Sequence, residues 1–108
     1  MHVVVSQAWT LDAEGHADAY VALSARFAEY FAAHPGFRGR WLVRDVDDPT
    51  HFTHIRMFDT VESYAEATRT PGYVEHTEAM YEHLRPYDTY PRTIGEVVLE
   101  DRSGAQWG

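Results

Sequence analysis

The stretch from Phe52 to His76 holds the side chains best suited to chemistry. Its first seven residues alternate as a β-strand does, so His54, Arg56 and Phe58 should share one face. An imidazole with its ordinary pKa of about 6.5 can accept a proton near neutral pH. A guanidinium can hold a developing oxyanion. The spacing therefore predicts a strand face on which His54 is a general base and Arg56 binds negatively charged oxygen.

Two helical segments should follow this strand. The first begins at Asp59 or Thr60, because either side chain can accept a hydrogen bond from an unpaired amide of the first turn. Thr70-Pro71 is a second start signal, since proline at the first helical position loses no needed donor. We expect helices over about 61–69 and 71–85, and the second would carry His76 towards the strand face.

The rest of the chain should supply the scaffold. Hydrophobic periodicity and turn residues predict strands over 2–10, 37–45 and 93–100 and a helix over about 16–33. The order strand, helix, strand, strand, helix, strand is typical of the ferredoxin-like α+β fold, a split β-α-β unit. We expect one domain over residues 1–108, with an antiparallel four-stranded sheet, helices on one face, and a polar tail over 101–108.

Large aromatic side chains fall on the sheet face that the helices should leave open. Trp9 and Trp41, with Phe52 and Phe58, are too apolar to remain wholly in water. A second copy packed sheet against sheet would cover them, so the sequence predicts a homodimer.

Composition excludes several classes of function. The formal charge of −8 argues against nucleic acids and anionic membranes as partners. Lysine and cysteine are absent, which excludes a lysine Schiff base, disulfides and thiolate chemistry. No metal site is expected either, because His51 and His54 differ in strand parity and point to opposite faces. Without a signal-type or membrane-spanning segment, a cytoplasmic location is expected.

Four short motifs resemble the antibiotic biosynthesis monooxygenase superfamily, the dimeric α/β-barrel proteins. The resemblance runs from Val3 to Leu99, and it implies the ferredoxin-like fold and the homodimer. The motifs are Phe31-Ala32-Ala33-His34-Pro35-Gly36-Phe37, Asp48-Pro49 before a strand ending in Phe58, Glu62-Ser63-Tyr64 and Pro71-Gly72-Tyr73.

Within that superfamily, the chain is most similar to oxygenases that convert anthrones to quinones without a cofactor. Their pattern has an amide residue at the position of Gln7, an Asn at that of His54 and a Trp at that of Phe58. The resemblance implies oxidation of an aromatic polyketide-type anthrone or quinol by O2, with His54 and Gln7 as catalytic residues. The expected substrate-binding residues are Trp9, Trp41, Arg56, Phe58, Tyr64, Tyr73 and His76.

Other interpretations stay open at this point. Haem-degrading relatives have a haem-ligating His at the position of His76 and a Trp at that of Ala67, so a haem-binding or metabolite-binding dimer is an alternative. Leu84-Arg85-Pro86-Tyr87 resembles a polyketide cyclase of the same fold. His54 could also be a half-exposed strand residue or a polar contact in the dimer interface.

Overall fold

Four strands form one antiparallel sheet in the computed structural model, which describes residues 1–86 and 91–101. Their order across the sheet is β2-β3-β1-β4. Strand β3 is central, so its residues pair with both β1 and β2. The strands are β1 (His2–Trp9), β2 (Phe37–Arg44), β3 (His51–Phe58) and β4 (Arg92–Glu96).

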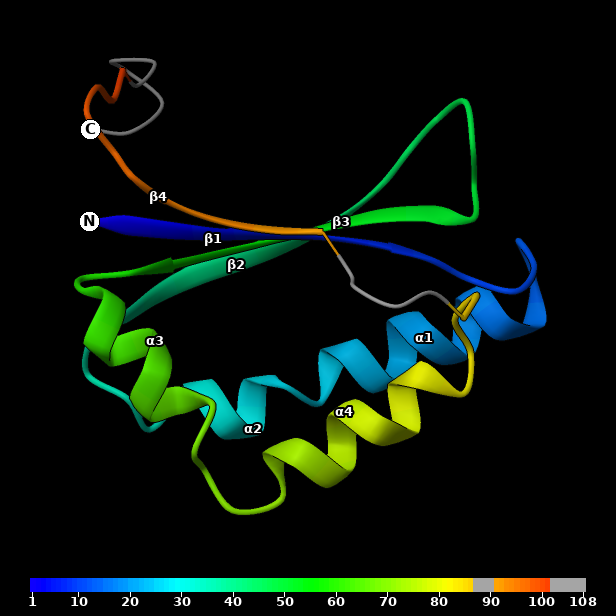
Figure 1. The fold of residues 1–108 in the computed structure, drawn as a ribbon, viewed down its shortest axis with the longest axis horizontal. Helices are drawn as coiled ribbons and strands as arrows, with labels where there is room; N and C mark the ends of the chain where they lie inside the picture. The colour runs from blue at the N-terminus through cyan, green and yellow to red at the C-terminus, as the bar shows by residue number, and fades with distance from the viewer. Residues whose placement is uncertain (87–90, 102–108) are drawn as a thin grey trace.

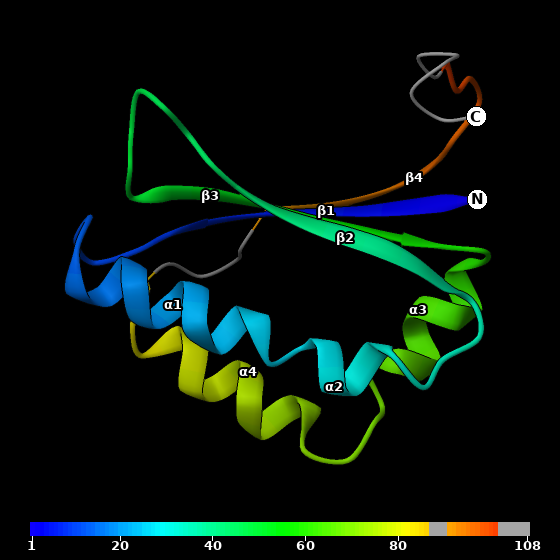
Figure 2. The ribbon, with the colours of Figure 1, turned by 180° about the vertical axis from the view of Figure 1, so that it is seen from behind.

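All the helices of the described chain lie against the same face of this sheet (Figures 1 and 2). They are α1 (Gly15–Ala25), α2 (Ala28–Phe31), α3 (Val61–Ala67) and α4 (Tyr73–Tyr81). Helices α1 and α4 run side by side beneath the sheet, and α3 lies near the end of β3. The predicted ferredoxin-like α+β fold, with helices on one face only, is confirmed.

Alternation along β3 separates the two faces of the sheet. Every second residue, starting from Phe52, is buried beneath the helices, and the residues between them are half-buried on the open face. The helix-covered face joins Phe52 and Phe58 to Val4 and Phe31 in one apolar core, so the prediction that these two phenylalanines share the open face with the tryptophans was wrong. The open face carries Trp41, whose side chain is 59% exposed in the single chain.

The predicted helix over 16–33 is interrupted at residues 26 and 27, between α1 and α2. Side chains from two other elements bind the last carbonyls of α1. Arg40 donates to the carbonyl oxygens of Ser24 and Ala25 at 2.7 and 3.3 Å, and His76 donates to that of Leu23 at 2.6 Å. Donors of this kind satisfy the carbonyls at a helix C-terminus and stabilise its dipole. The interruption therefore depends on tertiary contacts that local sequence does not reveal.

Helix α3 begins as predicted, because the Thr60 hydroxyl accepts a hydrogen bond from the Ser63 amide at 3.1 Å. The start of α4 was predicted two residues too early. It begins at Tyr73 rather than Pro71, after Gly72 with φ of +87°. Glycine adopts this left-handed conformation without steric cost, and here it redirects the chain between α3 and α4.

The last strand is shorter than predicted, since β4 ends at Glu96. Glu96 pairs with His2, the first residue of β1, and beyond this pair the Val97 amide donates one more hydrogen bond, at 2.9 Å, to the carbonyl oxygen of Met1, where the neighbouring chain begins. The predicted tail beyond Asp101 and the tyrosines at 87 and 90 lie outside the described residues. Among the residues that are described, no helix combines the length and apolar character needed to cross a membrane.

We predict that Gly36→Ala destabilises the fold by about 1–3 kcal/mol, the usual cost of overpacking. A Cβ at Gly36 would stand 2.2 Å from the Ser63 Oγ and 2.7 Å from its Cβ. Gly15→Ala is the matched control, because a Cβ at that position meets no atom within 4 Å. Urea denaturation measures both variants. Equal stability of the two would show that Ser63 and the loop before β2 move apart freely.

Candidate active site

A cavity of about 1060 Å³ lies between the helix-covered face of the sheet and the helices. Strands β1 and β3 contribute Ser6, His54 and Arg56 to its wall. Helices α3 and α4 contribute Tyr64 and Tyr73. A cavity of this size, with aromatic walls and a few polar groups, is typical of a small-molecule site.

The Arg56 side chain is buried at this wall, with 5% of its surface exposed. Its Nη2 donates a short hydrogen bond to the Ser6 hydroxyl, and its guanidinium carbon lies 5.5 Å from the centre of the Tyr64 ring. Its Nε has no hydrogen-bond partner in the described structure. The guanidinium therefore brings a positive charge and at least one unsatisfied donor to the cavity.

His54 lies two residues before Arg56 and is also buried, at 8% exposure. Its Nε2 lies 3.3 Å from the Arg40 Nη1, and because a guanidinium can only donate, Nε2 is the acceptor. Burial, reinforced by the Arg56 and Arg40 charges, lowers the pKa of His54 to about 2. The imidazole is therefore neutral near neutral pH, and the expectation of an ordinary histidine pKa was wrong. Desolvation and two cations, invisible in the strand pattern, cause the difference.

Two tyrosines form much of the aromatic wall. Tyr64 is buried, and its hydroxyl accepts a hydrogen bond from the Arg92 Nη1 at 3.1 Å. Tyr73 is half-buried, and burial raises the pKa of its hydroxyl. The Tyr73 hydroxyl is therefore protonated at neutral pH and can donate to a bound molecule. The structure brings these two predicted binding residues together with His54 and Arg56.

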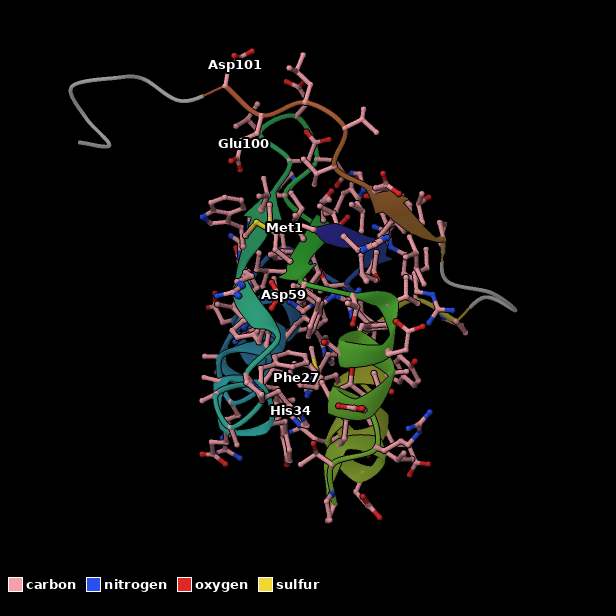
Figure 3. All side chains as sticks on the ribbon, turned by 90° about the vertical axis from the view of Figure 1, so that its left-hand side faces the viewer. Met1, Phe27, His34, Asp59, Glu100 and Asp101 are labelled. Carbon is pink, nitrogen blue, oxygen red and sulfur yellow. The ribbon has the colours of Figure 1, made fainter. Side chains whose placement is uncertain are left out.

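Phe27, in the break between α1 and α2, packs between two layers of helix. It projects into the space between α1–α2 and α3–α4 (Figure 3). Its ring centre lies 5.1 Å from that of Tyr73 and 4.7 Å from that of His76. It also lines the cavity. The break in the helix thus places an aromatic side chain at the site.

His76 was predicted to face the cavity, and the structure places it elsewhere. Its Nε2 donates to the carbonyl oxygen of Leu23 at 2.6 Å, which ties α4 to the end of α1. It is not among the residues that line the cavity. A haem-ligating imidazole needs a nitrogen directed at the iron, so the donor set at this position does not fit a haem group.

Gln7, Trp9 and Trp41 were predicted to share a pocket with His54. Gln7 does border the cavity, whereas neither tryptophan is among its lining residues. Gln7 pairs with Thr53, so its side chain projects from the open face, opposite to His54. Its Oε1 accepts hydrogen bonds from His51 Nε2 at 2.6 Å and from Thr53 Oγ1 at 2.8 Å.

The two tryptophans lie on the open face as well. The Trp9 ring stacks on His51 at 4.4 Å, with 4° between the planes. Trp41 pairs with Ile55 on β3 and is exposed. The alternation of side chains along each strand was predicted correctly. The prediction did not identify which of the two faces of β1 the helices cover.

Phe58 also differs from its predicted role as a cavity wall. It is fully buried, and its ring packs against Phe31, Phe37 and Tyr64 in the core. The core at the end of β3 excludes it from the cavity surface.

Sequence reasoning missed three polar residues of the site. Ser6 contacts Arg56, Arg40 contacts His54, and Arg92 contacts Tyr64. Ser6 and Arg40 lie directly opposite His54 and Arg56, respectively, in the strand register. A correct register would have found them, because residues opposite one another share a face. No group of three His, Asp or Glu side chains in the described part of the chain is placed to hold a metal ion.

Comparison with solved structures supports this fold over nearly the whole chain. SnoaB from Streptomyces nogalater, described as a cofactor-independent oxygenase, superposes with a TM-score of 0.74 at 21% identity, covering 92% of this chain and 95% of its own. A putative antibiotic biosynthesis monooxygenase from Nitrosomonas europaea gives 0.77 at 17% identity, covering 92% and 100%. Rv0793 from Mycobacterium tuberculosis gives 0.74 at 19% identity, covering 94% and 98%.

These identities establish shared fold, and the family assignment comes from sequence. No curated protein matches the chain significantly. The sequence profile described as antibiotic biosynthesis monooxygenase matches residues 2–79, from the start of β1 to within α4. That match spans most of the sheet and the helices that enclose the cavity, and the chain therefore belongs to the antibiotic biosynthesis monooxygenase family.

Proposed function

We propose that this chain is a cofactor-independent monooxygenase that oxidises an aromatic anthrone or quinol of the polyketide type. The observation that carries the proposal is the cavity, which combines tyrosine and phenylalanine walls with a buried guanidinium. Flat aromatic rings pack well against such walls. Membership of the family and the similar fold of SnoaB, described as a cofactor-independent oxygenase, support the same chemistry.

The reaction needs little from the protein beyond positioning and charge. An anthrone loses a proton, and the resulting carbanion passes one electron to O2. The radical pair combines into a peroxide, which loses water to leave the quinone. One oxygen atom enters the new carbonyl, and the other leaves in water with the two hydrogens of the oxidised carbon. Arg56, whose side chain is itself buried, would stabilise the developing oxyanion.

His54 is a proposed catalytic contact, but its low pKa makes it a weak proton acceptor. A neutral imidazole at this wall can still hydrogen-bond to substrate and hold Arg40 in place. We assign it that role in preference to general base. Gln7 is not proposed as an oxyanion donor here, because its side chain projects from the other face of the sheet, where its amide oxygen accepts hydrogen bonds from His51 and Thr53.

We expect the protein to accelerate O2 uptake by 1,8-dihydroxyanthrone in the absence of metal or added cofactor. One quinone should form per O2 consumed, with one labelled atom in the product when ¹⁸O2 is supplied. His54→Ala should lower the rate at least about tenfold through loss of a positioned group. His54→Asn should recover most of it, because an amide can still accept from Arg40. His34→Ala, outside the cavity, is the control.

A rate no faster than spontaneous oxidation, with the anthrone shown to bind, would contradict the oxygenase proposal and favour a metabolite-binding protein. Loss of about 10²–10⁴ in both His54 variants, with a rate that rises through a single pKa, would instead identify His54 as a general base.

We propose that the chain is a homodimer joined through the open sheet face. That face exposes Trp41 and Val43 on β2 at 59% and 47%. Trp41→Glu should therefore give a monomer at micromolar concentration by light scattering, because a buried unpaired charge is costly. Val46→Glu is the control, since Val46 is 95% exposed in the turn after β2. A monomeric parent protein would refute the dimer.

The buried His54 also predicts how stability depends on pH. Its folded pKa of about 2 lies below the unfolded value of 6.5, so the unfolded chain binds the extra proton between these limits. Stability contributed by this group is complete above pH 6.5 and falls as pH decreases through that window. Between pH 7 and pH 5 the free energy of unfolding should decrease by roughly 1–2 kcal/mol less in His54→Asn than in the parent protein. Equal slopes in urea denaturation for parent and variant would contradict the burial of a neutral His54.

A further inference from the structure

The charge balance at the cavity wall is unusual for a buried arginine. Only 5% of the Arg56 surface is exposed, yet no carboxylate of the described residues forms an ion pair with it. Its contacts there are the neutral Ser6 hydroxyl, the Tyr64 ring and the neighbouring Tyr73 side chain. Burying a guanidinium without a counter-ion is costly, so such groups are normally paired.

Further positive charge surrounds the same wall. Arg40 reaches His54 from β2, and burial together with repulsion from Arg56 lowers the pKa of Arg40. Arg92 lies at the rim and donates to the Tyr64 hydroxyl. Among the described lining residues the one carboxylate is Glu78, which is exposed. A chain of net charge −8 has thus concentrated cations at the wall of its cavity.

We propose that the cavity binds its aromatic ligand as an oxyanion, with the negative oxygen on Arg56. The aromatic character of the ligand rests on the proposed function, whereas the anion rests on the charge balance alone. The oxyanion is either a carboxylate or an ionised phenol. Either one neutralises the guanidinium and supplies acceptors for its N–H groups, which no described residue supplies in full.

A phenol bound at this wall has a direct chemical consequence. A cation close to the hydroxyl favours the ionised form, so the O–H bond breaks at a lower pH than it does in water. The electron pair stays on the phenolic oxygen, and the proton passes to solvent. Arg56 would then generate the electron-rich anion by charge, without a side chain acting as base.

Anaerobic binding tests the anion separately from oxygen chemistry. The probes are naphthalene-2-carboxylate, its neutral carboxamide, and 2-naphthol, whose ionisation changes its absorbance. We expect the carboxylate to bind at least about tenfold more tightly than the amide, or the naphthol to bind as naphtholate at pH 7.5. The first result identifies a carboxylate site and the second a phenolate site. Equal binding of amide and carboxylate with un-ionised naphthol, or binding of none of the three, overturns the proposal.

Substitution of Arg56 tests whether this residue causes the preference for the anion. Arg56→Met should reduce the preference for anion to within about twofold, whereas Arg56→Lys, which keeps the charge, should retain most of it. Arg38→Met is the matched control, because Arg38 is an exposed residue of β2 paired with Asp59. Circular dichroism checks that each variant folds. If Arg56→Met does not fold, the proposal is tested by the relative affinity of Arg56→Lys and of the parent protein for the carboxylate and the amide. An anion preference that survives in folded Arg56→Met also overturns the proposal.

The two proposals fail separately. Anion preference without O2 uptake would leave the binding site standing and remove the oxygenase. Oxidation of an anthrone without any preference for the anion would support the oxygenase and remove the proposed anion site.

Discussion

The alternation of β3, in the middle of the sheet, is the constraint on which the site depends. Because β3 pairs with β1 on one side and β2 on the other, its phase decides which face every opposing residue takes. One phase buries His54 and Arg56 with the apolar core beneath the helices. A slip of one residue would bring Thr53 and Ile55 there and remove the Arg56 guanidinium from the cavity.

The arrangement of the helices depends on polar contacts as well. Arg40 and His76 bind the carbonyls that end α1, so a strand and a distant helix both determine where the first helix stops. The resulting break carries Phe27 into the space between the helices and against Tyr73. The cavity is therefore built by hydrogen bonds that connect β2, α1 and α4, with apolar packing around them.

Much of the fold was predictable because its signals are local. Period-2 patterns gave all four strands, and Thr60 marked the start of α3. His54, Arg56, Tyr64 and Tyr73 were correctly grouped, since strand parity and helix order suffice to bring them together. Gln7 borders the cavity as predicted, but its side-chain amide faces away from His54, because its face depends on the register with Thr53, which is a non-local property. The low pKa of His54 was unpredictable for the same reason, because its main cause is burial beneath the helices, to which the charges of Arg56 and of Arg40 on another strand add.

The charges at the wall limit which residues can move protons there. A histidine beside two guanidinium groups loses its basicity, because its protonated form would add a third positive charge to a desolvated site. The same field acts in the opposite direction on an acidic ligand, whose ionised form it stabilises. In the reaction proposed here, the proton of the substrate would therefore pass to water rather than to His54. Under the same proposal, Arg40 and Arg56 would act by charge alone, and the aromatic walls would select which anion binds.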